Sequence, residues 1–322
     1  MEVKKILITD NVHPVMMEML EVAGFECHQV EDVDYDGLLK VVDDYDAMVV
    51  RSKVRIDKAF LDKCHRLKCI GRVGAGMETI DVECAEAKGV RCLNSPEGNR
   101  DAVGEHAVGL LLTLFDKIAS ADAEVREGLW QREENRGLEV KGKTIGIIGM
   151  GNMGGSFGRR LRGFDCEVIY YDLKGELAEG RVGLCPEAES VTREELMRGS
   201  DVVSLHVPLT DETRYMVNED FLNEFAKPIY LINTSRGAVV DTEGLVRAMK
   251  SGKVLGAALD VIEYEQMEKD SMGGADEPEA LRYLKESRRA VLTPHVAGWT
   301  VESKEKLASV LATKIIETLK TC

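Results

Sequence analysis

The sequence predicts an α/β fold with two doubly wound parallel sheets, and three observations support it. Short apolar segments alternate with amphipathic segments along the chain, which is typical of parallel sheets covered by helices on both faces. A glycine-rich turn lies between an apolar segment and a helical segment near the middle, at Gly149. With 322 residues the chain is long enough for two domains with separate cores.

The first series of elements covers residues 4–95. Strands are expected at Lys5–Thr9, Phe25–Val30, Ala47–Arg51, Cys69–Val73 and Val90–Asn94, with helices between them, for example Val15–Ala23 and Tyr35–Asp44. Residues 94–98 have the composition of a loop and indicate a domain border. One long helical stretch is expected over residues 101–127. Its apolar segment at 107–115 predicts a core element, a subunit contact, or both.

A second series starts at Lys143. Strands are expected at Thr144–Ile148, Glu167–Tyr171, Val202–Leu205, Pro228–Asn233, Gly256–Val261 and Ala290–Thr293. The acidic segment 265–289 predicts a surface loop with a short helix near 279–285. An amphipathic helix is expected at the end, over 301–319.

The glycine turn is typical of a dinucleotide site. Gly149 permits a tight turn, Gly151 lets the backbone approach a pyrophosphate, and Gly154 lets the following helix pack on the strand. Asp172 comes 23 residues after Gly149, the expected place for a carboxylate on the adenosine ribose. That carboxylate would repel a ribose phosphate and so favours NAD, although Lys174 leaves room for NADP.

Composition excludes several classes of partner. The net charge of −15 argues against nucleic-acid or anionic-membrane binding, and no apolar run has membrane-spanning length. The eight cysteines show no metal-binding spacing, so no metal is expected, and free thiols fit a reducing compartment. The N-terminus enters a strand at once, which predicts a cytoplasmic protein without a leader.

Three side chains after predicted strands suit hydride chemistry on an alcohol, which needs a base and a cation for the substrate. Arg236 follows one strand and can bind a carboxylate through two N–H groups, or can be a surface arginine. His295 follows Pro294 and suits the base. Spacing does not choose between Glu263 and Glu265 as its carboxylate partner.

These motifs, in this order, resemble the D-isomer-specific 2-hydroxyacid dehydrogenases over nearly the whole chain. The segments at 205–210, 233–241 and 256–260 and the Thr-Pro-His at 293–295 carry the resemblance. It implies a discontinuous flavodoxin-like substrate domain, residues 1–96 and 296–322, and a Rossmann NAD-binding domain, residues 97–295, with a cleft between them. It also implies a homodimer through the cofactor domain, with a tetramer left open.

The resemblance assigns roles by position. His295 would exchange the hydroxyl proton, Glu265 would support it, and Arg236 would bind the carboxylate and carbonyl oxygens. NAD would contact the glycine loop and four strand ends: Gly149, Gly151, Asn152, Met153, Gly154, Asp172, Val207, Pro208, Thr234, Ser235 and Asp260.

The substrate pattern resembles the family members that oxidise 3-phosphoglycerate, at the entry to serine biosynthesis. The corresponding positions are Arg51, Ser52, Gly74, Ala75 and Arg132, and the resemblance implies that Arg132 reaches the cleft of a neighbouring subunit. The chain stops at Cys322, so a serine-sensing C-terminal domain is not expected. A reductase of glyoxylate, hydroxypyruvate or another 2-keto acid stays open, as does an NAD-sensing, corepressor-like binding protein.

Overall fold

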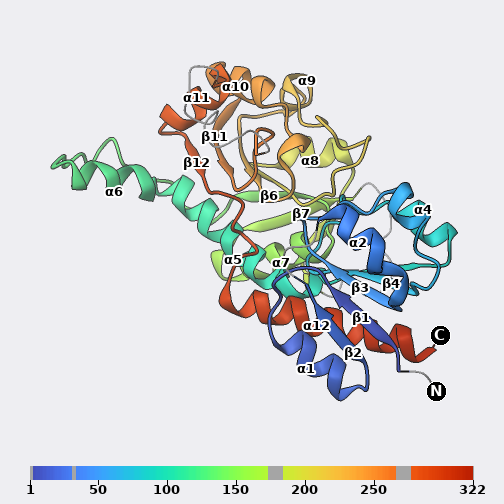
Figure 1. Cartoon of the computed structure of the whole chain (residues 1–322). Helices are drawn as coiled ribbons and strands as arrows, with labels where there is room; N and C mark the ends of the chain where they lie inside the picture. The colour runs from blue at the N-terminus through green and yellow to red at the C-terminus, as the bar shows by residue number, and fades with distance from the viewer. Residues whose placement is uncertain (1–2, 31–33, 173–183, 266–276, 322) are drawn as a thin grey trace. The chain divides into compact units, whose positions relative to one another are not determined.

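The computed structural model describes residues 3–30, 34–172, 184–265 and 277–321, and it contains two compact units (Figure 1). The first unit comprises Met1–Arg100 with Trp299–Cys322, and the second comprises Asp101–Gly298. Lys174 and residues 266–276 of the acidic segment lie outside the described residues.

The first unit is built on a five-stranded sheet in the order β2-β1-β3-β4-β5, with every pair parallel. Its strands are β1 (Lys5–Ile8), β2 (Glu26–Gln29), β3 (Ala47–Val50), β4 (Cys69–Arg72) and β5 (Arg91–Asn94). This is the flavodoxin-like strand order. The helices are α1 (Val15–Val22), α2 (Tyr35–Val41), η1 (Val42–Asp44), α3 (Lys58–Leu61), α4 (Val82–Ala87) and α12 (Val301–Thr321).

Alternation along the strands of the first unit divides its core into two layers. Ile6 and Ile8 of β1 pack with α1 and α12, whereas Leu7 packs with the cluster around Phe60 on the other face. The absence of a side chain at Gly71 lets α12 pack close to the sheet. A Cβ at that position would lie 3.0 Å from the Ile315 side chain. The C-terminal helix thereby completes the core of the N-terminal sheet.

The second unit carries a seven-stranded sheet in the order β12-β11-β10-β9-β6-β7-β8, again parallel throughout. The strands are β6 (Thr144–Ile148), β7 (Glu167–Tyr171), β8 (Glu189–Ser190), β9 (Val202–Leu205), β10 (Ile229–Asn233), β11 (Val254–Leu259) and β12 (Ala290–Leu292). The helices are α7 (Asn152–Arg160), η2 (Leu161–Phe164), α8 (Arg193–Gly199), α9 (Glu219–Asn223), η4 (Gly237–Val239), α10 (Thr242–Lys250) and α11 (Glu279–Glu286). Strand order reverses between β6 and β9, as in a Rossmann fold, so the predicted fold class is confirmed.

The expected single helix over residues 101–127 is wrong in two respects. The structure has α5 (Pro96–Phe115) and α6 (Ile118–Arg126), separated where Lys117 takes a left-handed φ of 54°. Pro96, expected in a loop, begins α5, because its fixed φ and missing N–H suit the first helical position.

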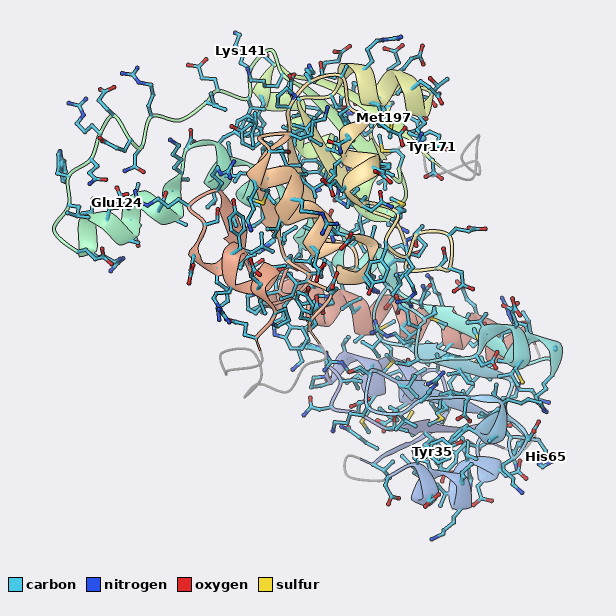
Figure 2. All side chains as sticks on the ribbon, turned by 90° about the horizontal axis from the view of Figure 1, so that it is seen from above. Tyr35, His65, Glu124, Lys141, Tyr171 and Met197 are labelled. Carbon is cyan, nitrogen blue, oxygen red and sulfur yellow. The ribbon has the colours of Figure 1, made fainter. Side chains whose placement is uncertain are left out.

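The apolar part of α5 and the segment after it have different surroundings. Leu110, Leu111 and Phe115 are buried in the core of the second unit. α6 instead projects from that unit, with Glu124 on the projecting helix and Lys141 near the sheet (Figures 1 and 2). Ile118, Val125, Leu129, Trp130 and Leu138 are exposed along this projection. Within the described ranges, no helix combines the length and apolar character needed to cross a membrane.

Candidate active site

The glycine turn after β6 has the shape that a dinucleotide requires. Gly149 has φ +92°, and a Cβ there would lie 2.6 Å from the carbonyl oxygen of His206. A Cβ on Gly154 would lie 2.1 Å from the Gly149 carbonyl oxygen, so α7 packs against the turn itself. A Cβ on Gly151 would meet no atom within 4 Å. The turn therefore leaves open space beside Gly151, at the start of α7, where a pyrophosphate fits.

The other expected cofactor positions follow the carboxyl ends of parallel strands. Asn152 and Met153 open α7, and Asp172 comes directly after β7. Its Oδ2 accepts a hydrogen bond of 3.0 Å from the Met150 backbone N–H, which places the carboxylate beside the glycine turn. Positions after β9, β10 and β11 complete the set: Val207, Pro208, Thr234, Ser235 and Asp260. These residues would hold NAD.

Two glycines of the turn should respond differently to one added methyl group. Gly154→Ala should lower the free energy of unfolding by about 1–3 kcal/mol, because its Cβ overlaps backbone. Gly151→Ala should keep the unfolding free energy within about 0.5 kcal/mol, since its φ of −74° suits alanine and its Cβ meets no atom.

The affinity for NAD is the second property to measure in the glycine variants. Gly151→Ala should weaken this affinity about tenfold or more, a loss of roughly 1.4 kcal/mol, because the methyl group occupies the pyrophosphate space. Thermal unfolding and calorimetric NAD titration measure the two effects. Unaltered NAD affinity in a folded Gly151→Ala protein would contradict this assignment.

His206, expected to shape the loop after β9, is a half-buried neutral side chain. Burial lowers its pKa from 6.5 to about 3. Its Nε2 lies 2.8 Å from the Ser204 hydroxyl and its Nδ1 lies 3.5 Å from Thr234 Oγ1, so the ring joins the ends of β9 and β10. It therefore connects the two loops after these strands without carrying charge near neutral pH.

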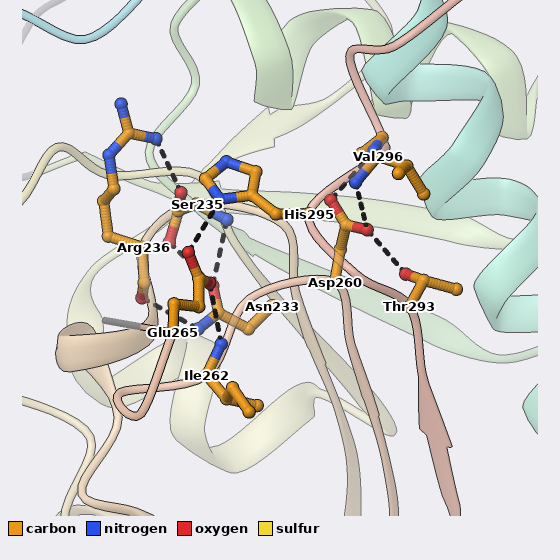
Figure 3. Close-up of polar contacts among 10 residues, drawn as sticks. Asn233, Ser235, Arg236, Asp260, Ile262, Glu265, Thr293, His295 and Val296 are labelled. Atoms are coloured by element: carbon orange, nitrogen blue, oxygen red, sulfur yellow. Dashed lines mark hydrogen bonds and ion pairs between the residues drawn. The ribbon is translucent and has the colours of Figure 1, made fainter. Parts of the chain in front are cut away.

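Asp260 anchors the loop that carries His295. Its carboxylate is 1% exposed and accepts hydrogen bonds from Thr293 Oγ1 (2.6 Å) and from the backbone N–H groups of Val296 and Ala297 (both 2.9 Å). Figure 3 shows the carboxylate bonds to Thr293 and Val296. The Asp260 carbonyl oxygen accepts from His295 N–H at 2.8 Å. These bonds stabilise His295 at φ 56°, a conformation that disfavours side chains other than glycine.

His106 belongs to the same network, a role that the sequence did not reveal beyond packing on its helix. Its Nε2 lies 3.1 Å from Thr293 Oγ1 and 3.5 Å from Asp260 Oδ1. Because the threonine hydroxyl donates its hydrogen to Asp260, Nε2–H of His106 is the donor to Thr293. α5 thereby contributes to holding the histidine loop.

His295 and Glu265 form the pair that the family resemblance implied. His295 Nδ1 lies 2.8 Å from Glu265 Oε2, and Glu265 Oε1 accepts from the Ile262 N–H at 3.0 Å (Figure 3). A carboxylate only accepts hydrogen bonds, so Nδ1 carries the hydrogen and Nε2 of the neutral ring keeps its lone pair. The hydrogen bond and the charge of Glu265 raise the pKa of His295, against the opposing effects of burial and Arg236.

Removing the charge of Glu265 should shift the pH profile in a known direction. A base works when neutral, so alcohol oxidation should rise as pH increases through the elevated pKa of His295. In Glu265→Gln the pKa loses its largest raising influence, and this acid limb should move to lower pH. Initial rates of NADH formation against pH measure it. Glu263→Gln is the matched control, and an unmoved limb in Glu265→Gln would refute the coupling.

Glu263 has a different partner, which distinguishes it from Glu265 in space. Its Oε2 accepts a hydrogen bond of 3.0 Å from the Thr242 N–H at the start of α10. Gly237 packs against the same segment, because its Cβ would lie 2.0 Å from the Ile262 carbonyl carbon. The Arg236 loop and the Glu265 segment are therefore in direct backbone contact.

Arg236 follows β10 in a loop that is held by the side chain of Asn233. Asn233 is fully buried, and its side chain donates to the Arg236 carbonyl at 3.0 Å and accepts from the Ser235 N–H at 3.0 Å and hydroxyl at 2.7 Å. The guanidinium is half-buried and donates to the Ser235 carbonyl at 2.7 Å (Figure 3). Arg236, Glu265 and His295 all belong to the second unit. The positive charge of Arg236 lowers the pKa of His295.

The expected substrate positions lie in both units. Arg51 and Ser52 follow β3, while Gly74 and Ala75 follow β4, at the same edge of the first sheet. Gly74 has φ +146°, a backbone conformation that L side chains rarely adopt, so another residue would be strained there. Arg132 lies in the second unit, exposed on the projection beyond α6.

Comparison with known proteins agrees with this arrangement. The family model of the D-isomer specific 2-hydroxyacid dehydrogenase NAD-binding domain matches residues 108–297. A glyoxylate reductase from Thermofilum pendens is 37% identical over 88% of this chain and 81% of its own length. A D-3-phosphoglycerate dehydrogenase from Archaeoglobus fulgidus is 32% identical over 98% of this chain, which spans 57% of that protein.

A solved structure shows the same fold over nearly the full chain. The glyoxylate reductase from Paecilomyes thermophila superposes with a TM-score of 0.84 at 26% identity, covering 98% of this chain and 95% of that one. The parallel sheets, the glycine turn and the family match together show that the chain belongs to the NAD-dependent D-isomer-specific 2-hydroxyacid dehydrogenases.

Proposed function

We propose that this dehydrogenase oxidises 3-phosphoglycerate at C2 to 3-phosphohydroxypyruvate. The observation that carries the chemistry is the 2.8 Å contact between His295 Nδ1 and Glu265 Oε2, with Arg236 on the adjoining loop. Bound NAD supplies the hydride acceptor for this oxidation.

His295 Nε2 takes the proton of the C2 hydroxyl as the C2 hydrogen leaves with its electron pair. Glu265 stabilises the imidazolium that forms, and it fixes the ring through Nδ1. Arg236 holds the substrate carboxylate and the oxygen that becomes the carbonyl, for which a planar guanidinium provides two parallel N–H donors. In the reverse direction the imidazolium returns the proton.

The choice of a phosphorylated acid rests on the expected substrate positions of the first unit and on Arg132 of the second. The substrate has a carboxylate at one end and a phosphate at the other, so it needs donors for two anions. Arg51 and Ser52 would meet the phosphate, and the N–H groups of Gly74 and Ala75 would meet the carboxylate. Arg132 would add a cation to the site of the neighbouring subunit. This many donors is more than glycolate or lactate requires.

A substrate panel tests this choice. NADH formation from 3-phosphoglycerate, D-glycerate, glycolate and D-lactate should show the highest kcat/KM for 3-phosphoglycerate. The advantage over D-glycerate should be about 10- to 100-fold, the range for hydrogen bonds to a charged group. A preference for an unphosphorylated acid would overturn the proposal.

A reductase of glyoxylate or hydroxypyruvate is the second candidate, favoured by the 37% identity to the Thermofilum pendens glyoxylate reductase. NADH oxidation with those two keto acids and with 3-phosphohydroxypyruvate distinguishes it. The reductase should prefer the short keto acids, whereas the proposed enzyme should prefer the phosphorylated one.

We further propose a homodimer formed through the second unit, in a reducing cytoplasmic compartment. Leu110 and Leu111, whose apolar segment suggested a subunit contact, are occupied in the core, so the exposed side chains on the projection beyond α5 become the contact surface. The described cysteines are all free thiols, which fits that compartment. Sedimentation velocity tests the dimer, and a monomer at assay concentration would contradict it.

A further inference from the structure

We propose that Trp299 is a positioning residue for Arg51 and thereby sets selectivity for acids with a second anionic group. The inference rests on the proposed function, because it takes Arg51 as the ligand of that group. The guanidinium carbon of Arg51 lies 5.2 Å from the centroid of the Trp299 ring, a cation–π distance. Both residues belong to the first unit.

Arg51 is held at its backbone and along its side chain. Its N–H donates to Asp10 Oδ2 at 2.9 Å, and Asp10 is 4% exposed, so the backbone is anchored to a buried carboxylate. Its Nη1 donates to the Asn11 carbonyl at 3.4 Å. A guanidinium carries five N–H donors at its edge, and an aromatic ring covers a face instead. Contact with Trp299 therefore orients the group while leaving edge donors for an oxyanion.

Trp299 is itself placed by its neighbours in the chain. Thr300 and Ser303 form reciprocal hydrogen bonds, each 3.0 Å, from the backbone N–H of one to the side-chain oxygen of the other. This cap fixes the start of α12 directly after Trp299. The indole is nevertheless 70% exposed, so it is not held as a core side chain. Its ring is available to the guanidinium and to a ligand beside it.

Trp299 can be observed alone, because the chain has two tryptophans and Trp130→Phe removes the other. In that background, Arg51→Met should change the emission intensity of Trp299, since it removes the cation near the ring. Arg55→Met is the control, as Arg55 has the same charge and lies on the same segment after β3. Saturating 3-phosphoglycerate should also change the emission, and D-glycerate at saturation should do so less.

Kinetics test the consequence for selectivity, expressed as kcat/KM for 3-phosphoglycerate divided by kcat/KM for D-glycerate. Trp299→Leu should lower this ratio about 3- to 10-fold through KM for the phosphorylated acid, as expected for a lost cation–π contact. Its kcat on D-glycerate should stay within about twofold. Trp299→Phe, which keeps an aromatic face, should restore most of the ratio.

Each outcome decides the inference separately from the proposed substrate. A wild-type ratio below one overturns the proposed function, yet a fall of that ratio in Trp299→Leu still supports the pairing. The inference is overturned if the ratio does not change, if phenylalanine and leucine act alike, or if both acids lose kcat equally. It is also overturned if Arg51→Met leaves the Trp299 emission unaltered.

Discussion

His295→Ala should lower kcat for alcohol oxidation by about two to four orders of magnitude, the usual contribution of a general base. The substitution removes the ring whose Nδ1 is engaged by Glu265 and whose Nε2 is left to take the proton. Affinity for NAD should change little, because the glycine turn and Asp172 directly follow β6 and β7, far along the chain from residue 295. Stopped-flow NADH formation and calorimetric NAD titration provide the two readouts.

A matched control exists for this variant. His65→Ala removes a histidine whose side chain is 74% exposed and pairs only loosely with Asp43 at 3.4 Å in the first unit. It should leave kcat unchanged. Turnover of His295→Ala within a few-fold of the parent would remove His295 from the proton transfer, whatever its contact with Glu265.

Arg236→Gln should lower kcat/KM by about 10²–10³-fold, the effect of losing one donor aimed at developing oxyanion charge. Glutamine keeps one N–H group and similar length but loses the positive charge and the two-point geometry. The loop itself should persist, because Asn233 holds the Arg236 carbonyl and the Ser235 N–H through backbone atoms. Both KM for the acid and kcat should worsen.

Arg236→Lys separates charge from geometry. A lysine supplies the charge without the planar fork, so it should recover only part of the loss. Arg198→Gln is the control, since that arginine is exposed on α8 of the same unit, away from the projection. Equal activity of the parent and Arg236→Gln would contradict a substrate contact at this position.

The sequence predicted those parts of the molecule that local chemistry dictates. The strands Thr144–Ile148 and Glu167–Tyr171 were expected with the observed bounds, because apolar β-branched runs end there at glycine and aspartate. The roles of the turn glycines could also be predicted, because each position in the glycine motif has its own steric requirement. Residues alone left Glu263 and Glu265 undecided, since spacing does not show which side chain faces His295.

What the sequence did not show depends on contacts between distant segments. Lys117 carries no breaker signal, yet the chain turns there through a left-handed conformation. His106 was assigned to packing because its partner Thr293 is 187 residues away. Trp299 was passed over for the same reason, as its partner Arg51 lies at the other end of the chain. A histidine or a tryptophan in a helix or loop gives no local sign of such a partner.

The most direct test of this account is the pH dependence of both reaction directions on one preparation. Oxidation requires neutral His295 and reduction requires its protonated form. Oxidation should therefore rise and reduction should fall as pH increases through the raised pKa of that histidine, and His295→Ala should lose both limbs. Limbs of the same sign in both directions, or limbs that survive the substitution, would contradict a proton exchanged at residue 295.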